Sequence, residues 1–219
     1  FSIRLWLMTM ILVFTTTTGT GLALAASNSV QPNEQHWSFN GIFGKFNRKE
    51  VQRGLQVYLE VCSSCHGLEY VAYRNLEEIG YSEEQIKAIA SQYEVEDSPN
   101  TVGEMFSRPA RPSDYFKSPY ANDMEAKMMN NGALPPDLSL IYKARPGGAD
   151  YIYSLLTGYE EDSESHETPE GLYYNPYFPG GAVAMPQPLY GDDVEYLDGT
   201  EATIEQEARD VAVFLTWAA

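Results

Sequence analysis

The pattern Cys62-Ser63-Ser64-Cys65-His66 constrains this chain more than any other feature, because it contains the only two cysteines. Two thiols three positions apart, followed at once by an imidazole, are typical of three kinds of site. These are a redox dithiol, part of a zinc site, and the attachment point of a c-type haem. A structural disulfide is a weak explanation, because bridging neighbours so close in sequence closes a very short loop.

The surrounding sequence favours the haem. A redox dithiol normally opens a helix that follows a strand, whereas here a predicted helix ends at the cysteines. Zinc needs four ligands, and neither His36 nor His166 has the paired spacing that would complete the set. For a c-type haem, Cys62 and Cys65 would each bond a vinyl group, and His66 would bind the iron.

The N-terminal residues predict targeting. Arg4 precedes an apolar run over 5–14, and small residues follow at 23–26. This is the pattern of a secretory signal over 1–26, and a bipartite mitochondrial presequence is an open alternative. The apolar run is short for a membrane span. We therefore expect a mature domain over 27–219 on the outer side of a membrane, where c-type haem is attached.

Helix caps and apolar spacing predict a mainly α domain. Asn47, Ser82, Asn122 and Thr203 each precede a Glu or Gln by three positions, which is a capping-box pattern. The expected helices begin at these caps, with a further one over 148–157. Alternating strand patterns are scarce, and the stretches 94–121 and 158–202 read as long irregular loops. Such loops need something to organise them, and a haem buried among short helices would do so.

Met185 is the candidate sixth ligand to the iron. It lies in the loop Phe178-Pro179-Gly180-Gly181-Ala182-Val183-Ala184-Met185-Pro186, which prolines hold extended and which lacks bulky side chains around the methionine. Such a backbone can approach a flat haem face closely. His and Met together raise the reduction potential of the iron.

The formal charge of -17 excludes a nucleic-acid partner, whose phosphates require basic surfaces. It favours a basic partner instead. Acidic residues are dense at 160–164 and at 192–195, although charge runs are usually solvated loops.

Several stretches resemble the cytochrome c1 family, the haem subunits of the ubiquinol–cytochrome c oxidoreductase (cytochrome bc1) complex. They are VCSSCHGLEYVAYRNL, GEMFSRPARPSDYF, NNGALPPDLSLI, GGADYIYSLLTGY, GLYYNPYFPGGAVAM and DVAVFLTWAA, and the match runs from Trp37 to Ala219. The resemblance implies a class I c-type cytochrome-like helical domain around one covalent haem c, with Cys62 and Cys65 on the vinyl groups and His66 and Met185 on the iron.

The resemblance also implies roles around the haem. The Pro136 carbonyl would accept a hydrogen bond from His66, and Arg145 would pair with a haem propionate. The remaining residues that would line the pocket are Asn130, Tyr151, Leu155, Phe178 and Leu215.

As to function, the resemblance implies a one-electron relay. The electron would come from the Rieske iron–sulfur protein and pass to cytochrome c, and cytochrome b would be a further partner in an inner-membrane complex. The haem domain would face the periplasm or the mitochondrial intermembrane space, and family members have a C-terminal membrane anchor, expected here beyond Ala219. No substrate-turnover site is expected on this subunit. A free-standing exported c-type carrier and an exported thiol oxidoreductase are the alternatives.

Overall fold

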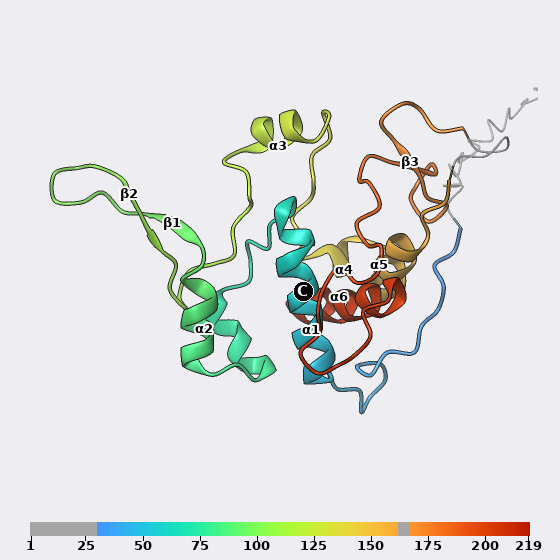
Figure 1. Ribbon diagram of the computed structural model, residues 1–219, viewed down its shortest axis with the longest axis horizontal. Helices are drawn as coiled ribbons and strands as arrows, with labels where there is room; N and C mark the ends of the chain where they lie inside the picture. Colours follow the sequence, from blue (N-terminus) through green and yellow to red (C-terminus); the bar gives the residue numbers. More distant parts are fainter. Residues whose placement is uncertain (1–29, 162–166) are drawn as a thin grey trace, which may run out of the picture.

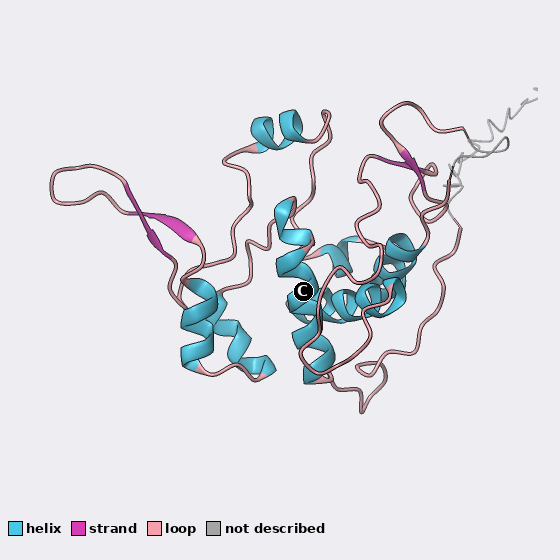
Figure 2. Ribbon diagram, in the orientation of Figure 1, coloured by secondary structure: helices cyan, strands magenta, loops and turns pink. Residues whose placement is uncertain are grey.

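The computed structural model describes residues 30–161 and 167–219, so the predicted signal over 1–26 lies outside the described residues. In the described part the fold is mainly helical, as predicted, with two small antiparallel sheets (Figure 2). The elements in chain order are α1 (Arg48–Glu60), η1 (Cys62–Ser64, a 3-10 helix), η2 (Tyr73–Ile79, also 3-10), α2 (Glu83–Ala90), β1 (Glu94–Asp97), β2 (Phe106–Pro109), α3 (Asp123–Met129), α4 (Ile141–Ala144), α5 (Gly148–Thr157), β3 (Tyr173–Tyr174), β4 (Ala182–Val183) and α6 (Ile204–Ala218).

The predicted caps begin their helices. Asn47 accepts from the Lys49 amide, Ser82 and Gln85 form a reciprocal capping box, and Thr203 accepts from the Gln206 amide. These side chains fix where the helices start because they satisfy backbone N–H groups that have no partner within the helix.

Three details of the prediction were wrong. Cys62 does not continue α1, which ends at Glu60 and tightens into the 3-10 turn η1. The stretch 94–121 is not wholly irregular, since β1 and β2 pair within it with Glu94 opposite Pro109. The helix after Ser82, predicted to run to about Tyr93, ends at Ala90, where a turn leads directly into β1. Both sheets form between very short strands. In such short segments an alternation of apolar and polar residues cannot be recognised in the sequence.

The core is built where α1 crosses α6 (Figure 1). Gly54 lies at the crossing, and a Cβ at this position would stand 2.0 Å from the Asp210 carbonyl oxygen. The missing side chain therefore allows the two backbones to touch. Tyr58 and Phe214 pack beside this contact with ring centroids 5.7 Å apart and planes tilted by 35°, and both are fully buried.

A buried ion pair joins the same two helices. Arg53 of α1 donates to both carboxylate oxygens of Asp210 of α6, from Nε at 2.7 Å and Nη2 at 2.9 Å. The Asp210 side chain is fully buried. The pairing fixes how α1 is rotated against α6, and so where the C-terminal end of α1 points.

The segment before α1 runs along α5. The Gln35 amide and the Trp37 indole nitrogen both donate to Asp150, at 3.0 and 2.6 Å. By contrast, the β1–β2 hairpin and the short α3 extend away from the helical body (Figure 1). In residues 30–161 and 167–219 there is no helix with both the length and the apolar content of a membrane span.

Candidate functional site

The two cysteines and His66 lie on a tight turn at the C-terminal end of α1. The Cys65 and His66 amides both donate to the Cys62 carbonyl, at 3.1 and 2.9 Å. The Ser63 and Ser64 hydroxyls donate to the Leu59 and Val61 carbonyls at the helix end, each at 2.8 Å. These bonds satisfy carbonyls that the helix leaves free and wind the pattern into one compact turn.

The Cys62 thiol is poorly suited to act as the nucleophile in disulfide exchange. Both cysteines are half-buried, and burial together with the neighbouring Cys65 raises the pKa of the Cys62 thiol to about 12. A reactive dithiol instead needs a thiolate favoured by a positive environment. The local structure agrees, because the pattern follows the C-terminal end of a helix and no strand precedes it between residues 30 and 61.

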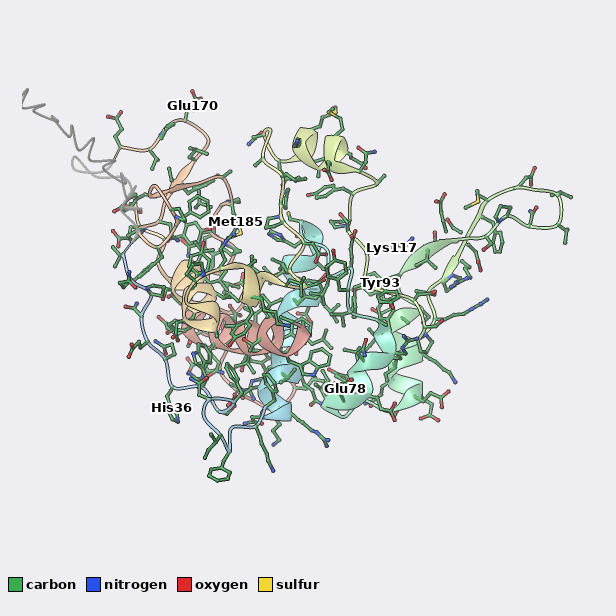
Figure 3. All side chains as sticks on the ribbon, turned by 180° about the vertical axis from the view of Figure 1, so that it is seen from behind. His36, Glu78, Tyr93, Lys117, Glu170 and Met185 are labelled. Carbon is green, nitrogen blue, oxygen red and sulfur yellow. The ribbon has the colours of Figure 1, made fainter. Side chains whose placement is uncertain are left out.

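The described part of the chain does not complete a zinc site. It holds no group of three or more His, Cys, Asp or Glu side chains arranged to bind a metal ion. His36 lies before α1, at the opposite end of the molecule from Met185 (Figure 3). His166, the other histidine considered from the sequence, lies outside the described residues.

His66 has one ring nitrogen engaged and one available. Its Nδ1 lies 2.8 Å from the Pro136 carbonyl oxygen. A carbonyl can only accept, so Nδ1 bears the proton and Nε2 keeps its lone pair. Burial lowers the pKa of His66 and outweighs the opposing effects of the Pro136 carbonyl and Asp137. A neutral imidazole oriented in this way fits an iron ligand.

Asp137 fixes the position of the Pro136 carbonyl. Its carboxylate accepts from the Glu69 and Ser139 amides, each at 2.8 Å. The Leu138 amide also donates to the Gly67 carbonyl at 2.9 Å. The turn after Pro136 is thereby bound to the residues that follow His66.

Met185 lies on the loop between β4 and α6, at the same end of the molecule as the C-terminal end of α1 (Figure 3). Its side chain is half-buried. Its carbonyl oxygen accepts a hydrogen bond from the Tyr159 hydroxyl at 3.0 Å. The thioether thus comes from a backbone that is fixed by a side chain of another segment.

Arg145 and Tyr151 form a polar group near this loop. Arg145 follows α4, is half-buried, and has no carboxylate within 4.0 Å among residues 30–161 and 167–219. Burial raises the pKa of Tyr151, and the positive charge of the nearby Arg145 opposes that rise. A guanidinium without an anionic partner fits an external carboxylate such as a haem propionate.

The other predicted lining residues occupy three places. Tyr151, Leu155 and Leu215 belong to the hydrophobic core or pack against it, as Cys62 does. Asn130 caps the end of α3 and donates to the Tyr120 hydroxyl at 2.9 Å. Phe178 is half-buried in the turn before β4.

Three residues of the site did not emerge from the sequence. Tyr120 accepts a hydrogen bond from the Asn130 side-chain amide at 2.9 Å; Asn130 lowers the pKa of the Tyr120 hydroxyl, whereas burial and the neighbouring Cys65 and Glu125 raise it on balance. Asp137 supports the Pro136 carbonyl, and Tyr159 holds the Met185 carbonyl. Asp137 and Tyr159 stand in LPPDL and LLTGY, two of the stretches on which the resemblance rests, but no local spacing gives their roles.

Comparison with known proteins gives a consistent result. The model of the cytochrome C1 family matches residues 37–219. Cytochrome c1 of Rhodospirillum rubrum is 47% identical over 211 residues, covering 89% of this chain and 78% of that protein. The mitochondrial cytochrome c1 haem protein of Saccharomyces cerevisiae is 48% identical, with 89% and 63% covered. The cytochrome b-c1 complex catalytic subunit of Candida albicans is 48% identical, with 89% and 68% covered.

Proposed function

This chain belongs to the cytochrome c1 family, and from that premise we propose that it is the electron-transfer subunit of a cytochrome b–c1 complex. Relatives in this family are named haem proteins and include bacterial and mitochondrial members. When bound, the haem c supplies a one-electron couple, and the protein binds, orients and shields it. The observation that carries the proposal is the His66–Pro136 contact of 2.8 Å directly beside the two cysteines.

The proposed haem attachment follows from that turn. Cys62 and Cys65 would form the two thioether bonds, and their position after α1 puts His66 next in line for the iron. The donated proton at Nδ1 keeps Nε2 aimed away from Pro136 and available as a ligand. Met185 would supply a second ligand to the iron, from a loop whose backbone accepts a hydrogen bond from Tyr159.

The residues around the two ligands would form the rest of the pocket. The Arg145 guanidinium, half-buried and without a carboxylate partner in the described chain, would bind a propionate. Asn130, Tyr151, Leu155, Phe178 and Leu215 would exclude water from the haem faces and edge. Helices packed around one covalent haem with His and Met ligands would give the class I c-type arrangement.

The proposed partners follow from the family. The electron donor would be the Rieske iron–sulfur protein, the acceptor cytochrome c, and cytochrome b the subunit that completes the complex. The net charge of -17 supports a basic acceptor, because opposite fields speed encounter without requiring a long-lived complex. In the acidic stretch 192–195, the Asp193 carboxylate accepts hydrogen bonds from the Tyr190 and Gly191 amides, at 2.6 and 3.0 Å.

The proposed placement is on a membrane. The mature protein would begin near residue 27, after a targeting segment over 1–26. Its haem domain would face the periplasm or the intermembrane space, and a C-terminal anchor beyond Ala219 would hold it in the inner membrane. This arrangement would bring the haem within reach of a mobile cytochrome c.

An optical redox titration of the matured protein tests the proposal. Haem should survive denaturing extraction and titrate at high potential. Met185→His should keep the haem but lower the potential, since two imidazoles favour ferric iron more than imidazole with thioether. Met128→His is the matched control, because Met128 is 77% exposed on α3 and should leave the potential unchanged. Loss of haem on extraction would refute its covalent attachment to Cys62 and Cys65. An unaltered reduction potential in Met185→His would refute Met185 as an iron ligand.

A further inference from the structure

Tyr159 links two separate segments of the chain at the proposed iron ligand. It stands two residues beyond the end of α5, and its hydroxyl donates to the Met185 carbonyl oxygen at 3.0 Å across 26 positions of sequence. Tyr159 itself is half-buried. The bond reaches the backbone of the very residue whose thioether is proposed to bind iron.

The base from which Tyr159 extends is rigid. Asn175 is fully buried and donates its side-chain amide to the Leu155 carbonyl, near the end of α5, at 2.8 Å. Gly158 allows close packing next to it, since a Cβ there would stand 2.4 Å from the Tyr177 ring. The backbone that leads into Tyr159 is therefore held by contacts with the segment around Asn175 and Tyr177.

The Met185 loop, in contrast, has little regular backbone bonding. β4 ends at Val183, and the prolines at 186 and 188 have no N–H to donate. The next element, α6, begins only at Ile204. A side-chain donor at Met185 thus supplies what a strand or helix would otherwise supply.

We propose that Tyr159 is a positioning residue for Met185, holding the thioether against the iron by its hydroxyl-to-carbonyl hydrogen bond. This inference rests on the proposed ligation by Met185. A thioether is a weak, neutral ligand, so its occupancy depends on how well the protein positions its backbone. Loss of one hydrogen bond should free the loop enough for an external ligand to compete.

The surroundings keep the hydroxyl a donor. Burial raises the pKa of Tyr159, and neighbouring Tyr151, Tyr190 and Tyr173 raise it further. The hydroxyl therefore stays protonated at neutral pH. Tyr151 in turn interacts with Arg145, so the donor to the Met185 carbonyl belongs to the same polar group as the proposed propionate partner.

Competition by imidazole for the ferric iron of the matured protein tests the role. Tyr159→Phe removes only the hydroxyl. It should lower the apparent Kd for imidazole by about threefold to tenfold, which is the fold-change that corresponds to the net free energy of one neutral hydrogen bond. It should also weaken the thioether-to-iron absorption band. Met185→Ala should bind imidazole most tightly of all the variants, because it has no thioether at this position to compete for the iron.

Tyr153→Phe is the matched control. Tyr153 lies within α5 and is also half-buried, but its ring packs edge-on against Trp37, and the charges that act on its hydroxyl are those of Glu205 and Arg209. This variant should bind imidazole as the unaltered protein does. Replacement of Tyr159 by a fluorotyrosine, a stronger donor of the same shape, should raise the Kd, and it decides the question if Tyr159→Phe yields no folded protein.

The outcomes separate the two proposals. Equal imidazole binding by Tyr159→Phe and the unaltered protein, with tighter binding by Met185→Ala, overturns the role of Tyr159 and leaves the ligation intact. Equal binding by Met185→Ala and the unaltered protein overturns the ligation itself. The same loosening in Tyr153→Phe and Tyr159→Phe would overturn the specific role of the hydrogen bond.

Discussion

The Nδ1 atom of His66 lies 2.8 Å from the carbonyl oxygen of Pro136, 70 positions further along the chain. The contact fixes the imidazole as the tautomer that leaves Nε2 free. Since a hydrogen bond at Nδ1 also makes the ring more basic, the same contact would favour ferric iron and lower the reduction potential in the proposed ligation. The proposed electron carrier therefore depends on a backbone atom that no side-chain substitution removes directly.

Asp137→Ala should loosen this contact indirectly. The Asp137 carboxylate accepts from two amides, and without it the Pro136 carbonyl loses its fixed position. We expect a rise in reduction potential of at most about 60 mV, which for one electron corresponds to about tenfold in the redox equilibrium. An optical redox titration measures it.

Asp137→Asn is the control for that variant. The amide oxygen can still accept a hydrogen bond, so the rise should be smaller than in Asp137→Ala. A fall in potential in Asp137→Ala would contradict the role of the turn.

Arg53→Met should destabilise the fold strongly. It leaves the Asp210 carboxylate buried without its partner, and breaking such a pair costs about 3 to 5 kcal/mol of unfolding free energy. Urea unfolding of the matured protein measures the loss. The double variant Arg53→Met with Asp210→Leu should recover most of it, because it removes the unpaired charge. A double variant as unstable as the single one would show that packing, not charge, sets the cost.

Gly54→Ala should also lower the unfolding free energy, by about 1 to 3 kcal/mol. The added methyl would stand 2.0 Å from the Asp210 carbonyl oxygen and 2.6 Å from the Phe214 Cβ, so α1 and α6 must move apart. The change in helix propensity acts in the opposite direction, since Ala favours a helix interior over Gly by about 1 kcal/mol, so a net loss of stability reports the clash. Equal stability of Gly54→Ala and the unaltered protein would mean that the crossing is not close-packed.

Glu207 should give stability a distinct pH dependence. It is fully buried on α6, and Oε1 accepts from the Asp193 and Val194 amides at 3.0 and 3.3 Å, whereas Oε2 has no partner in the described chain. Burial first, and the Asp193 carboxylate second, raise the pKa of Glu207 to about 7 from 4.5. The folded state thus retains a proton that the unfolded state releases.

The sign follows from that difference. Below pH 4.5 both states are protonated and the group contributes fully; stability then falls as pH rises from about 4.5 to about 7. Glu207→Gln cannot ionise and keeps the shape, so it should flatten this part of the curve and be the more stable protein at pH 8. Urea unfolding between pH 5 and 8 measures it, and parallel curves for the two proteins would refute an ionising Glu207.

Local sequence determined the features that depend on neighbours within about one helical turn. The spacing of Cys62, Cys65 and His66 predicted a covalent haem, and Asn47 and Thr203 fixed where α1 and α6 begin. Caps act on amides two or three positions away, so a short stretch of sequence contains all that they need. The motifs of the family resemblance added roles that no spacing could supply, among them the one for Pro136.

Tertiary structure decided the contacts between distant segments. Asp210 meets Arg53 across 157 positions, and Tyr159 meets Met185 across a loop without regular backbone bonding. The β1–β2 hairpin likewise formed in a stretch expected to be irregular. Such pairings depend on how α1, α5 and α6 pack, because packing decides which groups come within hydrogen-bond distance of a side chain. Local propensity does not determine which distant groups these are.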